Sequence, residues 1–365
     1  MYIENLELKN FRNYEKLNIE PVQGVNILTG DNAQGKTNIL EAVFFCAYGR
    51  SHRTTRDKEM QRFDAPFTQV SVKVKREPVD KQIVLRFNSE GRKFIEVNGR
   101  KITRIPDLLG NLYVIMFSPE DLKIVKETPG TRRRFLDMEI SALDKFYYHD
   151  LVSYNKVIQE RNNLLKMRSV DRTVLDVYDT NAAQYGARII QRRLEYIEQL
   201  NTKARPIHHE ITGGKEEIEI VYRTSLDPAK PLEASLKQLL AEHRRHDMDR
   251  AATSVGPHRD DFAILINGAD ARTFGSQGQQ RTVILTLKFA SLWIIRELTG
   301  EFPVLLLDDV LSELDLSRQN FILSSIEGIQ TIITMTGYEN IEKRLIEGAR
   351  VFQIKEGTAA MEVIG

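Results

Sequence analysis

Near-alternating hydrophobic and polar residues mark two stretches in the first third of the chain. The first stretch, MYIENLELKNF, is followed by a short apolar run over 25–28 that ends close to a glycine. The second, residues 67–104, alternates apolar and charged positions and contains turn signals, of which Asn98-Gly99 is the clearest. A period of two with Asn-Gly turns is typical of antiparallel β-strands. We therefore predict short strands at the start and an antiparallel meander after them.

The pattern becomes helical between residues 119 and 245. Apolar residues recur there at spacings of three, four or seven, within 147–165 and again within 190–197. This spacing predicts amphipathic helices. Pro206 and the glycine pair that begins at Gly213 are expected to break the second run, and no heptad persists long enough for a long coiled coil. We predict a mainly helical arm inserted over residues 119–245.

The pattern of an α/β fold returns after residue 250. Residues 274–298 are predicted to begin as a Gly-Ser-Gln turn and to continue as an amphipathic helix. The predicted strands are FAILING, FPVLLLDD and QTIITMT. Because strand and helix patterns occur at both ends of the chain, we predict one α/β domain with mixed and antiparallel sheets. It is built from residues 1–118 and 246–365, and the helical arm lies between them.

Composition limits the class of protein. No run approaches the ~18 consecutive apolar residues that span a bilayer, and polar residues occupy the N-terminus, so we expect a cytoplasmic protein with no membrane partner. The formal net charge is +1, but residues 1–118 carry 19 Lys and Arg against 14 Asp and Glu, whereas 246–365 carry 11 against 17. The excess of positive charge in residues 1–118 is compatible with binding to a phosphate backbone but does not require it. The single cysteine, Cys46, lies in the apolar run VFFCAY and is predicted to be buried.

A glycine-rich segment, GDNAQGKT, joins the first apolar run to a helical pattern. It matches G-x-x-x-x-G-K-[ST], the phosphate-binding loop of nucleotide-binding proteins. The glycines let the backbone curl around phosphate oxygens, the lysine reaches the β- and γ-phosphates, and the threonine hydroxyl joins a magnesium ion. The predicted ATP-binding residues of this loop are Gly30, Asp31, Asn32, Ala33, Gln34, Gly35, Lys36 and Thr37.

The strand FPVLLLDD ends in two acidic residues that provide a second anchor for magnesium. Its carboxyl end presents Asp308, which together with Thr37 forms the predicted metal site. Asp309 follows and is placed to face the attacking water as general base. Two acids can also simply end a strand and begin a turn, but the phosphate loop favours the metal interpretation. The predicted catalytic residues are Lys36, Asp308 and Asp309, and the predicted cofactors are ATP and Mg²⁺.

Several motifs, in a fixed order, resemble those of a known family. GDNAQGKTNILEA, SQGQQR and LLLDDVLSELD together resemble the ATPase head shared by SMC proteins and the ABC superfamily. More narrowly, the chain is similar to the RecF family of bacterial recombination mediators over nearly its whole length. The motifs that carry this similarity are LKNFRNY, GRSHRT, FSPEDL, RRRFLD and GPHRDD. The resemblance implies a P-loop ATPase head of the ABC/SMC type with a helical arm.

The resemblance also implies roles for further residues. The signature motif, which closes on ATP held by a second copy of the chain, would comprise Ser276, Gln277, Gly278 and Gln279. Ser312 and Asp315 would belong to the D-loop along the dimer seam. Arg12 and Asn13 would approach the nucleotide, and Arg53 or its neighbours would reach the phosphates. For Arg12, a solvated surface arginine is the alternative interpretation.

Three departures from the family pattern bear on hydrolysis. FSPEDL lacks the usual Q-loop glutamine, so Glu120 is predicted as a metal-side substitute, with a turn-capping acid as the alternative. Thr334 and Thr336 follow the last strand where relatives have a switch histidine. Asp309 stands where many relatives have glutamate, which is one methylene longer. These differences imply a weak, DNA-stimulated ATPase in which slow hydrolysis times the opening of the dimer.

Two histidine-containing segments are candidate metal sites. In GPHRDD, the groups with ligand chemistry are His258, Asp260 and Asp261, but we favour a turn capped by the carboxylates. In that interpretation Arg259 pairs with one of them. The His-His pair at 208–209 has no third ligand nearby, so solvated histidines are predicted there.

Clusters of Lys and Arg are candidate contacts to a phosphate backbone, which supplies most sequence-independent affinity for DNA. Lys73 and Lys75 lie two apart on a predicted strand and therefore share a face, although a solvated sheet has the same pattern. The predicted DNA-binding residues are Lys73, Lys75, Arg76, Arg92 and Lys93. Further clusters are Arg188 with Arg192, Arg244 with Arg245, and TRRRF, which alternatively holds the insert against the head. No stacking module or groove-reading helix is evident, so sequence-specific recognition is not predicted.

These features predict an ATP-dependent DNA-binding protein of recombinational DNA repair and replication-fork maintenance. Two copies would sandwich two ATP molecules, close on duplex DNA near single-stranded gaps or junctions, and help to load a recombinase. The resemblance adds RecR and RecO as partners. A P-loop kinase or GTPase would need no role for residues 274–281, and a transporter ATPase would place its signature sooner after the phosphate loop. An SMC-like tether is disfavoured by the short insert.

Overall fold

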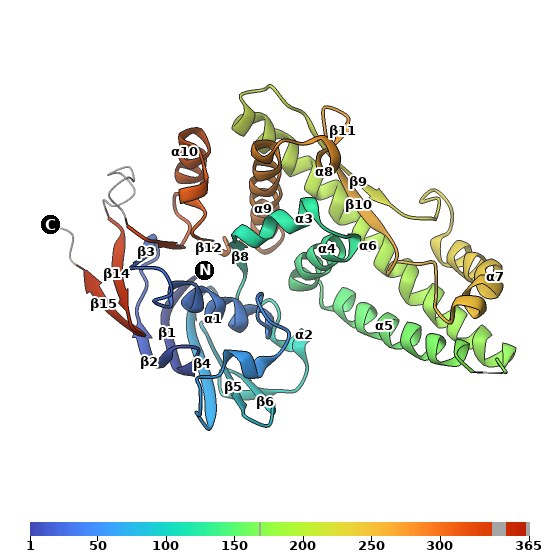
Figure 1. The fold of residues 1–365 in the computed structure, drawn as a ribbon, viewed down its shortest axis with the longest axis horizontal. Helices are drawn as coiled ribbons and strands as arrows, with labels where there is room; N and C mark the ends of the chain where they lie inside the picture. Colours follow the sequence, from blue (N-terminus) through green and yellow to red (C-terminus); the bar gives the residue numbers. More distant parts are fainter. Residues whose placement is uncertain (168, 338–347, 363–365) are drawn as a thin grey trace. The chain divides into compact units, whose positions relative to one another are not determined.

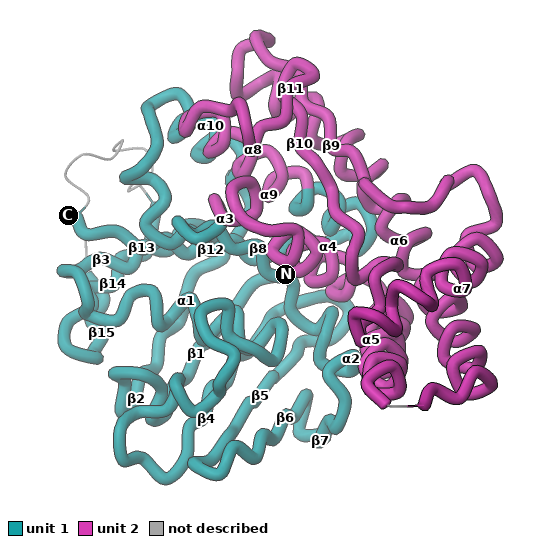
Figure 2. The backbone as a smooth tube through the Cα atoms, turned by 45° about the vertical axis from the view of Figure 1, so that its right-hand side comes forward, with its two compact units in different colours: residues 1–121, 291–365 teal, residues 122–290 magenta. Residues whose placement is uncertain are grey.

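The chain forms two compact units. A computed structural model describes residues 1–167, 169–337 and 348–362 (Figure 1). The first unit comprises residues 1–121 and 291–365, and the second comprises residues 122–290 (Figure 2). Among the described residues, no helix has the length and apolar character needed to cross a membrane.

The boundaries of the second unit differ from the expected arm at one end. The first boundary lies three residues from the expected one, but the second falls after residue 290 and not after 245. The reason is strand pairing: β10 (Asp261–Ile266) runs antiparallel to β9 (Ile218–Arg223), with Asp261 opposite Arg223. Residues 246–290 therefore belong to the same compact unit as the helices of the arm. The signature segment lies in this second unit.

One six-stranded sheet of the first unit carries the phosphate loop. Its order is β15-β14-β3-β13-β12-β8, with parallel pairing throughout except for the antiparallel edge strand β15. The strands are β3 (Val25–Thr29), β8 (Val114–Phe117), β12 (Val304–Asp308), β13 (Thr331–Met335), β14 (Arg350–Lys355) and β15 (Thr358–Glu362). The strands β8, β12 and β13 are mainly apolar and are buried along their whole length. Parallel pairing brings the carboxyl ends of β3, β12, β13 and β8 to the same edge.

The second sheet of this unit is the predicted antiparallel meander, extended by the first two strands. Its order is β2-β1-β4-β5-β6-β7. The strands are β1 (Tyr2–Phe11), β2 (Tyr14–Ile19), β4 (Phe67–Lys75), β5 (Lys81–Asn88), β6 (Lys93–Val97) and β7 (Arg100–Ile102). Helix α1 (Lys36–Tyr48) contacts strands of both sheets, so it is buried on nearly every side and Cys46 is fully buried, as predicted. The remaining short elements are η1 (Asp57–Met60), α2 (Ile105–Leu108), η2 (Pro119–Asp121), η3 (Leu311–Glu313) and α10 (Leu316–Ser325).

The second unit is mainly helical, with a small three-stranded sheet. Its helices are α3 (Leu122–Lys126), α4 (Pro129–Leu143), α5 (Lys145–Leu165), α6 (Arg172–Thr212), α7 (Leu232–Arg250) and α8 (Ala271–Phe274). Helix α9 (Gln277–Thr299) begins in this unit. The sheet has the order β11-β10-β9, where β11 is Ala269–Asp270. Helix α6 contacts α5, α7 and β9, which makes it the central element of the unit (Figure 1).

Pro206 does not end the second helical run, which corrects the sequence prediction. Helix α6 continues for 41 residues with Pro206 inside it. A proline inside a helix costs ~3 kcal/mol, but Ala204 and Ile207 are buried on either side of it, and this packing holds the helix together. The helix ends as predicted at Gly213, which adopts the left-handed conformation with φ 61°.

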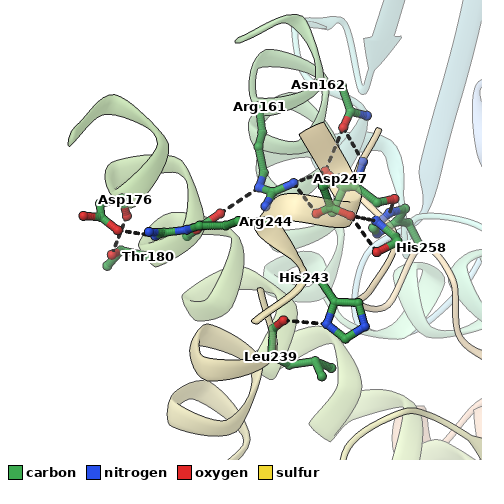
Figure 3. Close-up of polar contacts among 12 residues, drawn as sticks. Arg161, Asn162, Asp176, Thr180, Leu239, His243, Arg244, Asp247 and His258 are labelled. Carbon is green, nitrogen blue, oxygen red and sulfur yellow. Dashed lines mark hydrogen bonds and ion pairs between the residues drawn. The ribbon is translucent and has the colours of Figure 1, made fainter. Parts of the chain in front are cut away.

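A buried ionic cluster joins the helices α5, α6 and α7 (Figure 3). Arg161 on α5 is fully buried and donates to Asp179 on α6 at 2.7 Å and to Asp247 on α7 at 2.8 Å. Arg244 donates to the second oxygen of Asp179 at 2.7 Å. Asp247 also accepts hydrogen bonds from the backbone and hydroxyl of Ser254, at 3.0 and 2.6 Å. The cluster therefore fixes the three helices to one another and to the segment that follows α7.

We predict that Asp247→Ala lowers the free energy of unfolding by about 3–5 kcal/mol, because it leaves the buried Arg161 without one of its two carboxylate partners. Asp249→Ala, an exposed carboxylate on the same helix, is the matched control and should change it by less than ~0.5 kcal/mol. Urea unfolding followed by far-UV circular dichroism measures both. Equal stabilities for the two variants would contradict a structural role for the cluster.

Candidate nucleotide site and signature

Two glycines shape the phosphate loop between β3 and α1. Gly30 has φ 146° and Gly35 has φ 114°, values that side chains rarely adopt. A Cβ atom at Gly30 would lie 2.3 Å from the carbonyl oxygen of Ile354, and one at Gly35 would lie 2.6 Å from Nδ2 of Asn13. The loop therefore needs glycine at both positions, for its backbone angles and for the space that neighbouring strands leave.

Lys36, the first residue of α1, folds back over this loop. Its Nζ donates to the carbonyl oxygens of Gly30 at 2.6 Å and Asp31 at 2.8 Å. Burial lowers the pKa of Lys36, and the negative charges of Asp309, Asp31 and Asp308 offset part of that effect. A positive charge is thus held at the helix N-terminus, where the loop amides also favour an anion.

The carboxylate of Asp308 meets the end of the loop. Its Oδ1 accepts hydrogen bonds from the hydroxyls of Thr37 and Thr334, each at 2.8 Å. Asp308 is buried at the carboxyl end of β12, and Thr334 comes from the neighbouring strand β13. A hydroxyl and a carboxylate oxygen in direct contact are hard ligands of the kind that Mg²⁺ takes beside nucleotide phosphates, so these residues fit the predicted metal. Thr334 thus fixes the orientation of the Asp308 carboxylate.

Asp309 lies in an exposed and unusual position. Its φ of 53° is in the left-handed region, where a residue other than glycine costs ~1 kcal/mol or more. The backbone is held there because its N–H donates to Thr334 Oγ1 at 2.9 Å and its carbonyl accepts from Ser312 Oγ at 2.8 Å. Asp308 is therefore buried and Asp309 exposed, although the two residues are adjacent, and their roles as metal ligand and general base stay predictions.

The turn between β1 and β2 supports the loop from outside. Asn13 Nδ2 donates to the carbonyl oxygen of Gln34 at 2.8 Å, and Asn13 Oδ1 accepts from Asn38 Nδ2 at 2.9 Å. The Tyr14 hydroxyl donates to the carbonyl oxygen of Gly35 at 3.1 Å. Asn13 therefore contacts the loop backbone and the start of α1, and its approach to the nucleotide stays a prediction.

Arg12 is paired with a residue that the sequence did not single out. Its guanidinium donates to both oxygens of Glu41 on α1, at 2.8 and 2.6 Å. Glu41 is fully buried and also accepts from the Ser51 hydroxyl at 2.5 Å. Burial alone would raise the pKa of Glu41, but the hydrogen bonds from Arg12 and Ser51 and the charges of Arg12 and Arg53 hold it below its ordinary value. Arg12 is therefore not a solvated surface arginine, and Arg53 lies 3.6 Å from the same carboxylate.

The remaining predicted residues of the first unit lie on segments that follow β8 and β12. Glu120 is exposed in η2, directly after β8, the strand next to β12. Ser312 lies in η3, and Asp315 caps α10 by accepting from the backbone of Arg318 at 3.0 Å. These positions leave the proposed roles of Glu120 and of the D-loop pair as predictions.

The signature segment, in the second unit, forms a capping box at the start of α9. The Ser276 hydroxyl accepts from the backbone N–H of Gln279 at 3.2 Å, and Gln279 Oε1 accepts from the backbone N–H of Ser276 at 2.8 Å. Ser276 and Gln277 are exposed, and Gly278 is half-buried. The Ser276 hydroxyl is an acceptor in this box and keeps its own proton to donate. The opening of α9 is therefore a fixed structure and not a flexible linker.

The segment GPHRDD is a structural turn, with partners that differ from those expected. Arg259 donates twice to the carbonyl oxygen of Thr253, at 3.1 and 2.9 Å, and not to a carboxylate. Asp261 is instead paired with Arg132 of the triple-arginine segment at 2.7 Å, inside the second unit. His258 Nδ1 lies 2.7 Å from the Tyr154 hydroxyl, so it belongs to the buried packing. In the described part of the chain, no cluster of three or more His, Cys, Asp or Glu side chains has the arrangement of a metal site.

His208 is fully buried, which corrects the prediction of a solvated histidine there. Its Nδ1 lies 3.0 Å from Thr286 Oγ1, and its Nε2 lies 3.3 Å from Glu216. Burial lowers the pKa of His208, although Glu216 raises it in part. His209 is exposed, as predicted, because adjacent residues of a helix point in different directions.

The predicted DNA-contacting cations have two different environments. Lys73 is exposed on β4, and Lys75 on the same face lies 2.6 Å from Asp80. Arg92 is exposed, near the turn that precedes β6. Arg76 instead donates to Glu301 at 2.5 Å, and Lys93 contacts Asp57 at 2.7 Å. The last two cations therefore hold the fold of the first unit together.

Comparison with known proteins places these features in a family. A family described as "AAA domain" matches residues 5–244. "DNA replication and repair protein RecF" of Clostridium perfringens (strain SM101 / Type A) is 52% identical over 357 residues, which cover 98% of this chain and 99% of that protein. The RecF protein of Clostridium acetobutylicum is 52% identical over 361 residues, with 99% of each chain covered.

Solved structures give the same result. "Structure of the recombination mediator protein RecF-ATP in RecFOR pathway" matches with a TM-score of 0.92 and 39% identity, covering 99% of this chain and 98% of that chain. A Smc head domain from Pyrococcus furiosus matches with a TM-score of 0.57 and 17% identity, covering 100% and 96%, which shows a shared fold alone. The predicted α/β ATPase head with a helical arm is confirmed, and the chain belongs to the RecF family.

Proposed function

We propose that this protein is an ATP-dependent DNA-binding protein of recombinational DNA repair and replication-fork maintenance. The observation that carries the proposal is the contact between Thr37 at the end of the phosphate loop and Asp308 at the end of β12. This contact brings the predicted phosphate and metal groups to one sheet edge. Two RecF structures that match this chain over 98% of their own length are named as RecF-ATP and RecF-ATPrS, and these names support a nucleotide ligand.

The residues of the first unit have distinct tasks in this proposal. The loop amides and Lys36 would bind the phosphates, while Thr37 and Asp308 would hold Mg²⁺. When bound, Mg²⁺ neutralises charge that develops on the phosphate oxygens. Asp309 is exposed beside these groups and accepts the proton of the attacking water. Its side chain is one methylene shorter than that of glutamate, which we propose makes hydrolysis slow. We further propose that DNA binding stimulates hydrolysis.

The second unit provides the signature that completes the site in a second copy of the chain. Ser276 donates its hydroxyl proton, and the amides at the start of α9 donate theirs, to the γ-phosphate held by the other protomer. Ser312 and Asp315 line the seam between the protomers. ATP thereby joins two copies into a dimer, which opens after hydrolysis.

The open face of the antiparallel sheet is the proposed DNA surface. Strand register places Lys16, Lys9, Gln69 and Arg86 opposite one another in a single row across β2, β1, β4 and β5. Lys9 and Lys16 are exposed and directly paired, an arrangement of like charges that destabilises a sheet and is therefore consistent with a functional role. Lys73 lies on the same face of β4. This surface suits the backbone of duplex DNA near single-stranded gaps, where we propose that the dimer helps to load recombinase.

The proposed protein partners follow from the relatives alone. The matched RecF structures are described as those of a recombination mediator protein in the RecFOR pathway. We propose RecR and RecO as partners of this chain on that basis.

We predict that Thr37→Ala weakens Mg²⁺-ATP binding about 10- to 100-fold, because the metal loses an oxygen ligand. Binding of ATP in the presence of EDTA should change by less than about threefold, since the loop amides and Lys36 remain. Isothermal titration calorimetry measures both affinities. Thr37→Ser keeps the hydroxyl and is the control, which should bind like the wild type. An equal loss with and without Mg²⁺ would show that Thr37 does not serve the metal.

We predict that Ser276→Arg abolishes ATP-induced dimerisation, because a bulky side chain replaces the hydroxyl that faces the other protomer's nucleotide. Multi-angle light scattering with a non-hydrolysable ATP analogue measures the mass. Ser89→Arg, at an exposed serine between β5 and β6, is the matched control and should dimerise normally. A wild type that stays monomeric with the analogue, or a Ser276→Arg variant that dimerises equally well, would refute the role of the signature in trans.

We predict that Lys9→Gln with Lys16→Gln reduces the slope of log affinity against log salt by about 0.9 for each phosphate that the variant no longer neutralises. The measurement is a salt titration of duplex DNA binding in the presence of the ATP analogue. Lys355→Gln removes an exposed lysine from β14 of the other sheet and is the control, with an unchanged slope expected. If the double variant keeps the wild-type affinity and slope, this face is not the DNA surface.

A further inference from the structure

The signature is tied to the end of the arm helix α6 by side-chain contacts inside the second unit. Gln279 accepts from the backbone of Ser276 with its Oε1, at 2.8 Å, and donates from its Nε2 to Glu216 Oε1 at 2.9 Å. Both ends of this amide are therefore occupied, and the side chain has one defined orientation. Glu216 is the residue that supplies the contact outside the capping box.

Glu216 also lies next to the buried His208 of α6. His208 Nδ1 lies 3.0 Å from Thr286 Oγ1, and that hydroxyl donates its only proton to the carbonyl oxygen of Thr282 at 2.9 Å. His208 Nδ1 must then be the donor, so Nε2 of the neutral ring is an acceptor; it lies 3.3 Å from Glu216 Oε2 without a hydrogen bond. One oxygen of Glu216 thus faces α6, and the other faces the signature.

The backbone around Glu216 is fixed on both sides. On one side, α6 ends at Gly213, and Gly214 donates to the carbonyl oxygen of His209 at 2.8 Å. On the other side, the backbone of Glu217 exchanges hydrogen bonds with Asn267, at 2.8 and 2.9 Å, where β9 begins beside β10. The position of Glu216 therefore follows from the end of α6 and from the small sheet.

We propose that Glu216 is a positioning residue for the signature: it fixes Gln279, and through it the Ser276 hydroxyl that faces the second copy's ATP. This inference rests on the proposed role of the signature in the ATP-bound dimer. In this proposal, the affinity of the dimer depends on the position of the end of α6, because Glu216 closely follows that end. Because α6 has 41 residues and rises ~1.5 Å per residue, it links Glu216 to the buried cluster at Asp179, near its other end.

The test compares dimer dissociation constants in the full-length protein, by analytical ultracentrifugation with a non-hydrolysable ATP analogue. Glu216→Ala should weaken the dimer about tenfold, the effect of losing one hydrogen bond to a charged group. Glu217→Ala removes the exposed neighbouring carboxylate and should leave the dimer unchanged. Glu216→Gln should restore wild-type dimerisation, because its amide oxygen can accept from Gln279 while its amide nitrogen donates to His208 Nε2.

A double-mutant cycle separates positioning from a general structural effect. Gln279→Ala should weaken the dimer as much as Glu216→Ala does, and the two changes together should have no larger effect than either alone. Binding of ATP to the monomer, measured at low protein concentration, should stay at the wild-type value in all these variants, and Gln279→Ala should cost no more folding stability than the ~1 kcal/mol typical of a lost helix cap. Dimerisation of Glu216→Ala equal to that of Glu217→Ala would overturn the proposal, as would effects of Glu216→Ala and Gln279→Ala that simply add.

The Ser276→Arg variant distinguishes this inference from the proposed function. If Ser276→Arg dimerises like the wild type, the signature has no role in trans and the proposed function fails with the inference. If Ser276→Arg stays monomeric while Glu216→Ala dimerises normally, only the inference about Glu216 fails.

Discussion

The hydrogen bonds to the carboxylate of Asp308 are the interaction on which the nucleotide site depends. Asp308 lies at the carboxyl end of β12, and the hydroxyls that it accepts from belong to the start of α1 and to the end of β13. This arrangement is possible because parallel pairing brings the ends of these strands to one edge. Thr334 contributes twice, since it also accepts from the backbone of Asp309 and so stabilises that residue's left-handed conformation. One threonine thus orients the metal-side carboxylate and the candidate base.

In the proposed dimer, the second unit presents a rigid donor to the nucleotide held by the other protomer. The capping box between Ser276 and Gln279 satisfies backbone donors at the start of α9 and leaves the hydroxyl proton of Ser276 for a partner. Glu216 connects this box to α6, and the cluster around Arg161 connects α6 to α5 and α7 (Figure 3). The arm is therefore built as one framework of polar contacts that ends at the signature.

Local sequence patterns predicted the parts of the fold that depend on local physics. The glycines of the phosphate loop, the apolar β12 and the Asn-Gly turn are each determined by a few adjacent residues, and all lie where expected. Pairing between distant segments was not predictable in this way: β9 and β10 belong together although 37 residues separate Arg223 from Asp261, so the second boundary of the arm was placed too early. Side-chain contacts between distant residues were even less predictable. Nothing in the sequence near Glu41 indicates its contact with Arg12, and nothing near Glu216 indicates its contact with Gln279.

Each nucleotide site, in the function proposed here, needs the phosphate loop of one protomer and the signature of another. ATP hydrolysis by a mixture of two inactive variants tests this requirement directly. Lys36→Ala disables the phosphate loop and Ser276→Arg disables the signature, so each protein alone should have no activity. A heterodimer of the two contains one site with both parts intact, and we predict that mixing restores DNA-stimulated hydrolysis. A mixture that is as inactive as its separate components would contradict the shared site.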